Sequence, residues 1–405
     1  MLLPQLFEQS AARTPEKAAV VDLNTGEETS YAELREQALT IATALRERGI
    51  EKGDRVAICM ANRPEHVATF LTTQIVGIIA VPFNFRLAPE GVRYHLSDAD
   101  PELLLFDAAG HESVTAIAES VEDAIEMVYV GADPPSFAAP FESFLDSAPP
   151  AERSTASIAH EDPSVMLYSS GTTGDPKGIP LDHEATSSRF LINSLGQGYY
   201  LEETMIGVMP LYHTVGLHGI LCGLLAMSGT YLCMPQFDPE TAVRTVEEYG
   251  VTALHEAPTV FAQLLDTDAI ETTDVSSVRA VGYSGAPMSQ SVFDRTLRVL
   301  NPDHIANLYG TTEAYGTLGY PDLREVRDPT VTGPANVGFE TQIIEIGSQD
   351  PKAVLDAGTA GELAVNTDRR SRSIVTGRSP RRPTRRSTTA GFSPATSRAG
   401  PPITR

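Results

Sequence analysis

A short string of small and hydroxyl-bearing side chains offers the clearest chemistry in this 405-residue sequence. It reads Ser169-Ser-Gly-Thr-Thr-Gly-Asp-Pro-Lys-Gly178 and ends the apolar run that begins at Val165. Glycines let backbone N–H groups turn toward an anion, and hydroxyls with one ammonium group complete a cradle for phosphate. Gly171 and Gly174 are too close together for a Walker loop, and Lys177 precedes Gly, not Ser or Thr. The string predicts a phosphate site, against the alternative of an ordinary surface turn.

A second string, Asn307-Leu-Tyr-Gly-Thr-Thr-Glu313, suits the rest of a nucleotide. Tyr309 offers a flat face for adenine, and the hydroxyls of Thr311 and Thr312 are placed to reach an α-phosphate. Glu313 supplies a hard oxygen ligand of the kind that Mg²⁺ takes together with phosphates. Taken alone, the string is typical of a Tyr-Gly turn with a solvated glutamate. Together with the phosphate string, it favours a nucleotide site.

The surrounding pattern alternates helical and strand-like segments. The sequence predicts helices over 31–48 and 65–75 and strands over 55–60, 77–83 and 102–106. This order indicates a mostly parallel sheet covered by helices, and the alternation resumes up to about residue 330. Residues 132–163, rich in Pro, Ala, Ser and acids, predict a surface connection between the two stretches. Residues 215–234 are uncharged but interrupted by glycines, which favours a buried helix and strand over a membrane span.

Charge is distributed unevenly along the chain. The first 368 residues hold 20 basic and 53 acidic side chains, whereas the last 37 hold ten arginines and no acidic residue. Only four lysines occur in the whole sequence. A strongly acidic, lysine-poor surface stays solvated at high salt and repels nucleic acid and anionic membranes. We expect a halophilic protein without a nucleic-acid partner, the alternative being an ordinary acidic enzyme.

The cysteines and the start of the chain point to the cytoplasm. Cys59, Cys222 and Cys233 lack the spacing of a zinc site, and their odd number implies no disulfide framework. Residues 1–6 lead into an amphipathic helical pattern and not into a signal peptide. We therefore expect cytoplasmic localisation and no membrane span.

Several further strings occur in the order found in one known family. The phosphate string resembles the signature loop of adenylate-forming enzymes, the AMP-binding superfamily that includes the acyl-CoA synthetases, or acid–CoA ligases. The other strings match further segments of that family and extend the resemblance over about residues 1–377; they are Thr29–Leu34, Gly53–Ile58, Met209–Gly216, Ser284–Met288, Asn307–Glu313 and Gly358–Val365.

The resemblance implies a reaction and a set of site residues. The family activates a carboxylic acid, fatty or aryl, with ATP and Mg²⁺ to acyl-AMP and then forms a thioester with coenzyme A. Catalysis is expected from Lys177, Thr312, Glu313 and His213, with Glu313 on the metal and with His213 and Gly285 at the acid. The ATP-binding residues implied by the resemblance are Ser169, Ser170, Gly171, Thr172, Thr173, Gly174, Lys177, Gly285, Ala286, Pro287, Asn307, Tyr309, Gly310, Thr311 and Thr312.

The neighbourhood of His213 distinguishes between branches of that superfamily. Amino-acid-activating members carry an aspartate nearby that pairs with the substrate's ammonium group. The string Tyr212-His-Thr-Val-Gly-Leu-His-Gly219 offers no carboxylate. It therefore favours an acid without an α-amine, although a purely structural histidine is the alternative for His213.

The resemblance also implies a domain organisation. We expect α/β architecture with two mostly parallel sheets flanked by helices (αβαβα type) and an incomplete small β unit. The expected divisions are 1–160 and 161–330, two α/β subdomains with the ATP and acyl sites in the second, 331–377, a partial β-barrel, and 378–405, a basic tail unlike the family.

Three parts of the family's machinery are not identifiable in the sequence: a ribose-binding Asp, the Arg that follows it, and the lysine of a C-terminal domain. The abrupt change of charge near Gly377 predicts that the tail is a frameshift product and the chain truncated. Two hypotheses stay open, an acid–CoA ligase and a non-catalytic fragment that at most binds ATP or acid.

Overall fold

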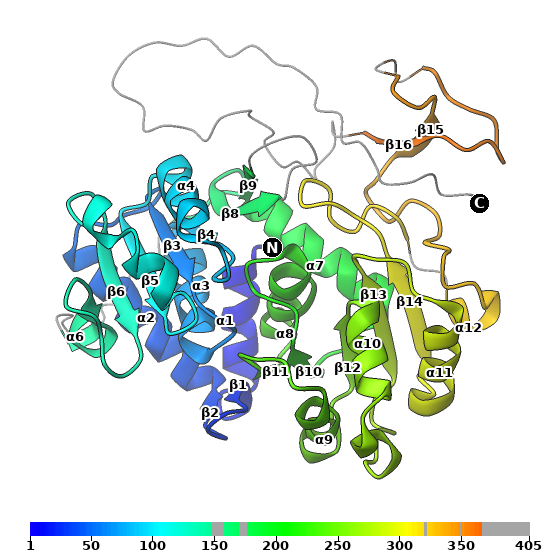
Figure 1. The fold of residues 1–405 in the computed structure, drawn as a ribbon, viewed down its shortest axis with the longest axis horizontal. Coiled ribbons are helices and arrows are strands. Elements are labelled where there is room, and N and C mark those ends of the chain that lie inside the picture. The colour runs from blue at the N-terminus through cyan, green and yellow to red at the C-terminus, as the bar shows by residue number, and fades with distance from the viewer. Residues whose placement is uncertain (147–156, 170–175, 320–321, 349, 351, 367–405) are drawn as a thin grey trace.

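The protein folds as layers of helices and sheets in a computed structural model (Figure 1). The structure describes residues 1–146, 157–169, 176–319, 322–348, 350 and 352–366. The tail 378–405, with the predicted frameshift, lies outside the described residues. Sheets flanked by helices on both sides confirm the α/β fold class expected from the sequence.

A seven-stranded sheet organises the first part of the chain. Its strand order is β7-β6-β5-β3-β4-β8-β9, and every neighbouring pair is parallel except β8 and β9. Three of these strands, β3, β4 and β5, coincide with the first three predicted from the sequence. The strands are β3 (Arg55–Cys59), β4 (Ile79–Pro82), β5 (Leu103–Asp107), β6 (Glu126–Val130), β7 (Ala139–Pro140), β8 (Pro163–Ser169) and β9 (Lys177–Asp182).

Helices cover this sheet, and their ends follow local chemistry. The hydroxyl of Ser30 accepts a hydrogen bond from the Glu33 backbone N–H, and the Glu33 carboxylate accepts one from the Ser30 N–H, which fixes the start of α2. Gly77 ends α3 in the left-handed conformation, with φ of 74°. The helices are α1 (Leu3–Arg13), α2 (Tyr31–Glu47), α3 (Pro64–Val76), α4 (Pro89–Ala99), α5 (His111–Thr115), η1 (Ala118–Ser120) and α6 (Phe141–Asp146).

The expectation of a plain surface connection over 132–163 is wrong for its described portion. That stretch contains strand β7 and helix α6, and α6 buries Phe141 and Phe144 against the sheet layer. The stretch is predicted as a loop because it is rich in Pro, Ala and Ser. The free energy gained by burying the two phenylalanine side chains is enough to form a helix in spite of that composition.

Two smaller sheets form the second part. β12, β13 and β14 make a parallel three-stranded sheet, and β1 and β2 from the start of the chain complete a four-stranded sheet, in the order β10-β11-β1-β2. β8 and β9 belong to the first sheet although they follow residue 160, and the division at that residue stays a prediction. The strands are β1 (Ala18–Asp22), β2 (Glu28–Ser30), β10 (Thr204–Gly207), β11 (Thr230–Cys233), β12 (Ala253–Glu256), β13 (Ala280–Ser284) and β14 (His304–Leu308).

The helices of the second part include one that connects the sheets. α7 contacts β8 and β9 of the seven-stranded sheet and β13 and β14 of the three-stranded sheet. The predicted buried helix and strand over 215–234 are confirmed as η2, α8 and β11. The helices are α7 (His183–Gln197), the π-helical η2 (Val215–Leu221), α8 (Cys222–Ala226), α9 (Pro239–Tyr249), α10 (Pro258–Leu265), η3 (Asp268–Glu271), α11 (Gln290–Leu300) and α12 (Leu323–Val326).

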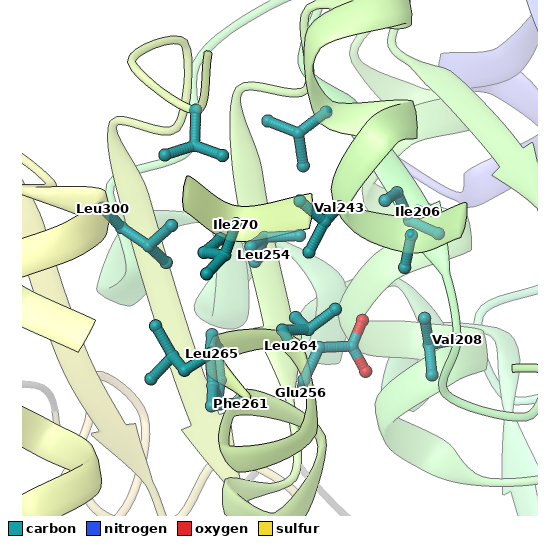
Figure 2. Close-up of a pocket in the computed structure, with 13 residues that line it drawn as sticks. Ile206, Val208, Val243, Leu254, Glu256, Phe261, Leu264, Leu265, Ile270 and Leu300 are labelled. Atoms are coloured by element: carbon teal, nitrogen blue, oxygen red, sulfur yellow. The ribbon is translucent and has the colours of Figure 1, made fainter. Parts of the chain in front are cut away.

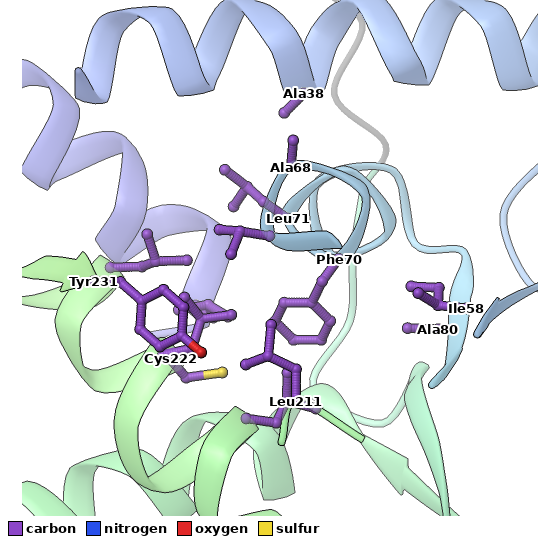
Figure 3. Packing of buried hydrophobic residues seen from close by; sticks show 14 of the residues in the cluster. Ala38, Ile58, Ala68, Phe70, Leu71, Ala80, Leu211, Cys222 and Tyr231 are labelled. Atoms are coloured by element: carbon purple, nitrogen blue, oxygen red, sulfur yellow. The ribbon is translucent and has the colours of Figure 1, made fainter. Parts of the chain in front are cut away.

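One apolar core joins both parts. Phe70 and Leu71 of α3 pack toward Leu211, Cys222 and Tyr231 from the second part (Figure 3). Because these side chains are fully buried, the two parts cannot separate without exposing a large apolar surface.

A small antiparallel pair follows, β15 (Thr341–Ile344) with β16 (Glu362–Val365), inside the stretch where the sequence predicts a β unit. A partial barrel over 331–377 stays a prediction. Among the described residues, no helix is long and apolar enough to cross a membrane.

Candidate functional site

The two ends of the predicted phosphate loop form an antiparallel hairpin. Ser169 at the end of β8 pairs with Lys177 at the start of β9. The Tyr94 hydroxyl donates to the Pro176 carbonyl oxygen at 2.7 Å, which fixes the point where the loop re-enters the sheet. Lys177 is exposed. Ser170, Gly171, Thr172, Thr173 and Gly174 lie outside the described residues.

Two other predicted segments follow adjacent parallel strands. Ser284 of β13 pairs with Leu308 of β14, so Gly285 and Tyr309 leave the same edge of the sheet side by side. Gly285 adopts φ of 82°, and the exposed Ala286 and Pro287 follow it. The carboxyl ends of neighbouring parallel strands are the usual location of ligand sites in α/β folds.

Asn307 and Tyr309 differ in how available they are. Asn307 is buried, and its amide nitrogen donates to the Pro329 carbonyl oxygen at 3.3 Å, so this side chain positions the chain. Tyr309 is half-buried, and desolvation raises the pKa of its hydroxyl, which stays protonated at neutral pH.

A tight turn carries the two threonines and the glutamate. A Cβ on Gly310 would lie 2.6 Å from the Gly316 nitrogen and 2.8 Å from the Ala314 oxygen, so only glycine fits. The Thr311 hydroxyl accepts a hydrogen bond from the Ala314 N–H at 3.2 Å. Thr312 and Glu313 lie half-buried within this turn. A fixed turn of this kind holds its outer side chains in defined directions.

His213 lies on a segment that Asn62 anchors. The buried Asn62 amide nitrogen donates to the carbonyl oxygens of Gly207 and Met209, and its oxygen accepts from the Leu211 N–H. Three hydrogen bonds from one side chain fix the chain shortly before His213.

The protonation state of His213 follows from its surroundings. Its Nδ1 accepts a hydrogen bond from the Val215 N–H at 3.2 Å, which leaves the proton of the neutral ring on Nε2. Although His213 remains accessible to solvent, the protein packed around its ring lowers the pKa by desolvation. A neutral imidazole with a free Nε2–H can donate a hydrogen bond to a carboxylate.

Arg189 of α7 brings the His213 segment and the Thr312–Glu313 turn together. Its Nη1 donates to the Thr214 hydroxyl at 3.3 Å, and its Nη2 donates to the backbone oxygens of Thr312 at 2.9 Å and Glu313 at 3.2 Å. Burial lowers the pKa of this guanidinium to about 10, which still leaves it charged at neutral pH.

An apolar cluster lies beside His213. Val215, Leu308 and Tyr315 are buried together, and Met209 packs against them. The Tyr315 hydroxyl donates to the Asn193 amide oxygen at 3.0 Å, which orients the ring. The cluster makes the protein interior next to His213 apolar.

The described residues contain no group of three or more His, Cys, Asp or Glu side chains that could hold a metal by themselves. Glu313 fits the narrower requirement of Mg²⁺, which commonly binds through one carboxylate together with substrate phosphates and water. The chemistry of the donor therefore suits a magnesium–nucleotide complex but not a metal cage made by protein alone.

A cavity elsewhere in the molecule has a different character. It lies between helices α9 and α10 and strands β10 and β12, and its free volume of 20 Å³ has room for about one water molecule. The buried carboxyl group of Glu256 enters it among aliphatic side chains and Phe261 (Figure 2). None of the predicted site residues lines this cavity.

Sequence reasoning missed four residues that organise the site: Asn62, Arg189, Asn193 and Tyr315. For two of them the sequence holds a pattern that points the wrong way. Arg189 and Asn193 are spaced four residues apart on a helix whose leucines lie on another face, and such a pattern places the polar face toward solvent, whereas both side chains are buried. For Asn62 and Tyr315 the sequence holds no comparable pattern.

The chain belongs to the AMP-binding enzyme family, whose pattern matches residues 7–372. It is 32% identical over 373 residues to a 4-chlorobenzoate–CoA ligase of Arthrobacter sp, covering 89% of this chain and 67% of that protein. The chain thus spans about two thirds of the length of that relative. This confirms the resemblance stated on the motifs.

Solved structures agree with this assignment. The ATP-bound MatB of Rhodopseudomonas palustris is similar with a TM-score of 0.76 and 26% identity, over 90% of this chain and 70% of that one. The N-terminal domain of FACL13 of Mycobacterium tuberculosis shares the fold, with a TM-score of 0.77 and 22% identity, over 90% of this chain and 89% of that one.

Proposed function

We propose that this chain carries the ATP- and acid-binding half of an AMP-forming acid–CoA ligase. In the first step, a carboxylate oxygen of the acid forms a bond to the α-phosphorus of ATP, and the bond to pyrophosphate breaks. In the second, the sulfur of coenzyme A bonds to the acyl carbon, and AMP leaves. The observation that carries the proposal is the contact of one buried arginine with both the His213 segment and the Thr312–Glu313 turn.

Each predicted residue has a physical role in this proposal. Backbone N–H groups of residues 169–174 and the Lys177 ammonium bind the outer phosphates, and Thr311 and Thr312 lie toward the α-phosphate. Gly285, Ala286 and Pro287 leave room for adenine opposite Tyr309. Glu313 would hold Mg²⁺, which neutralises phosphate charge while the acid attacks. Positioning and charge neutralisation supply most of the rate in such displacements.

An apolar acid without an α-amine fits the His213 side of the site best. The neutral Nε2–H of His213 can donate to the acid's carboxylate, and the Val215, Leu308 and Tyr315 cluster suits an aryl or fatty chain. The similarity to a 4-chlorobenzoate–CoA ligase supports the aryl alternative. Pyrophosphate release with a panel of aryl and fatty acids determines which chain length or ring substituents of the acid the site accepts.

The nucleotide site is tested by calorimetric titration of Mg²⁺·ATP. We expect the parent chain to bind and the Thr172→Ala, Lys177→Ala double variant to bind much more weakly, because a hydroxyl and an ammonium group are lost from the phosphate cradle. Lys17→Ala serves as the control, since the ammonium group of Lys17 forms an exposed ion pair with Glu202. Equal affinity of the double variant and the parent would remove the loop from the site.

Catalysis is tested by pyrophosphate release with ATP, Mg²⁺ and a panel of aryl, fatty and amino acids. The acidic surface leads us to propose a salt-adapted cytoplasmic enzyme, so the assay is run at high and low salt. Release that depends on an aryl or fatty acid supports the ligase. Binding without release supports the non-catalytic fragment, and preference for amino acids would contradict the assignment of the acid site.

A further inference from the structure

Helix α7 reverses the usual pattern of a surface helix. Arg189, Asn193 and Gln197, spaced four residues apart, are all buried, whereas Leu191 is 41% and Leu195 76% exposed. A surface helix normally buries leucine and exposes arginine. Two residues of this polar face, Arg189 and Asn193, make hydrogen bonds that apolar side chains cannot make.

The contacts of that face converge on the candidate site. Arg189 donates to Thr214, Thr312 and Glu313, as described above. One turn further along, the Asn193 amide nitrogen donates to the Gly219 carbonyl oxygen at 2.8 Å, and its oxygen accepts from the Tyr315 hydroxyl. α7 thus holds two segments that are about a hundred residues apart in the chain.

Burying a guanidinium is costly unless its hydrogen bonds are satisfied; the three acceptors of Arg189 are neutral oxygens, and the carboxylates of Glu313 and Asp182 act on its charge from further away. An uncharged side chain would avoid that cost. What arginine adds is a planar fork whose nitrogens can bind separate acceptors at fixed angles. This geometry joins Thr214 to the backbone of Thr312 and Glu313.

We propose that Arg189 is a positioning residue of the adenylation site. By holding the backbone oxygens of Thr312 and Glu313, it fixes the direction in which the Glu313 carboxylate faces the magnesium–phosphate group. By holding Thr214, it fixes the distance of that carboxylate from His213. The proposal rests on the proposed function and requires no contact between Arg189 and substrate.

Arg189→Lys separates positioning from charge. Lysine keeps the positive charge, but its single ammonium group cannot reproduce the fork. A role in positioning Glu313 predicts loss of the affinity that Mg²⁺ adds to ATP binding, by about tenfold, the effect of a lost hydrogen bond to a charged group. ATP affinity in the presence of a chelator should stay at the parent level, since the charge is retained.

The matched control is Arg279→Lys. Like Arg189, Arg279 donates to a backbone carbonyl, that of Gly198 at 2.8 Å; unlike Arg189, it also forms a salt bridge, with Glu203. It precedes β13 and so lies at the opposite end of that strand from Gly285. We expect this variant to bind ATP as the parent does, with and without Mg²⁺.

Titration calorimetry of the full chain, with circular dichroism as a check of folding, decides between the outcomes. If the parent binds neither Mg²⁺·ATP nor an acyl-adenylate mimic, the proposed function is wrong, and the positioning role falls with it. If the parent binds and Arg189→Lys shows the same Mg²⁺-dependent gain, the function stands and the positioning role is wrong. Equal losses with and without Mg²⁺ would also overturn it, because they indicate a direct charge effect.

Thr214→Val is a second variant for the case in which Arg189→Lys does not fold. It removes the hydroxyl that accepts from Arg189 and that also hydrogen-bonds to His218 Nδ1 at 3.0 Å, keeps the shape of the side chain and leaves Arg189 in place. We expect weaker binding of the acyl-adenylate mimic, which contacts the His213 side, with unchanged Mg²⁺·ATP affinity. Unchanged affinity for the mimic would contradict the proposed link between Arg189 and the His213 segment.

Discussion

Replacing Glu256 with leucine should make the native protein more stable. The Glu256 side chain is 1% exposed, lies among aliphatic residues and has no hydrogen-bond partner in the described part of the chain. Burying an unpartnered polar group costs about 1–3 kcal/mol in proteins. Leucine has a similar size and no polar atom, so Glu256→Leu should raise the free energy of unfolding by about 2 kcal/mol at pH 4.5.

The gain should increase as the pH rises. Burial raises the pKa of the native Glu256 carboxyl well above its ordinary value of 4.5. Above pH 4.5 the unfolded chain loses this proton while the native protein keeps it, so the carboxyl lowers stability by about 1.4 kcal/mol per pH unit. The decline continues until the native carboxyl ionises. Leucine does not titrate, and its advantage over the parent widens through the same window.

Urea unfolding followed by far-ultraviolet circular dichroism measures the effect at pH 4.5, 5.5 and 6.5. Glu256→Gln is the informative companion, because it removes the titration but keeps an unpartnered polar group. Glu248→Leu on the exposed face of α9 is the control and should change stability by less than about 0.5 kcal/mol. Absence of any gain in the leucine variant, with a pH slope that persists in the glutamine variant, would refute the argument, because the slope would then come from other groups and the carboxyl would not lower stability.

Three further outcomes are expected. Gly216→Ala should destabilise the protein by about 2 kcal/mol or more in urea unfolding, because its Cβ would lie 2.4 Å from the carbonyl oxygens of Met209 and Pro210. Gly223→Ala should be close to neutral, because its Cβ would meet the Ser194 hydroxyl at 3.2 Å and the Met227 methyl group at 3.8 Å, both at the ends of side chains. Asn62→Ala should lower the free energy of unfolding by about 2–3 kcal/mol, since three backbone groups lose their hydrogen-bond partner. It should also weaken binding of an acyl-adenylate mimic. A folded variant that retains the parent's affinity would argue against the role of Asn62 in placing His213. Burial lowers the pKa of His255 to about 3 and that of His66 to about 4, so as the pH falls these groups take up protons in the unfolded chain before they do so in the native protein. Stability should therefore fall as the pH drops from 6.5 toward 4. A His255→Phe variant should lose less stability over that range, and an unchanged dependence of stability on pH would refute the burial argument.

The sequence predicted much of the fold because its local signals agree with one another. The capping pair Ser30 and Glu33 marks the start of α2, and the apolar runs at 55–60 and 102–106 coincide with β3 and β5. The direction of β9 was not predictable, since an apolar run reads the same in a parallel and an antiparallel strand. Helix α6 was missed because two buried phenylalanines define it and not a periodic pattern.

For the candidate site, sequence reasoning proposed residues within motifs but not the side chains that hold those segments in place. Gly285 and Tyr309 follow strands that pair with each other, which the α/β pattern allows one to expect. Asn62 and Arg189 act through backbone carbonyl oxygens far away in the chain. A backbone carbonyl occurs at every residue, so no residue type in the sequence marks the partner of such a side chain.

The hairpin of β8 and β9 holds both ends of the predicted phosphate loop, so the loop can be replaced without changing the strands that flank it. Ser169 and Lys177 are paired, so the seven residues between them begin and end at points that the sheet holds together. Lengthening such a connection adds only a modest entropic cost, about 0.6 kcal/mol for each doubling of a flexible loop. Loops from related enzymes could therefore be transplanted between these two residues without altering the register of the sheet, and under the proposed function such exchanges would change nucleotide binding separately from fold stability.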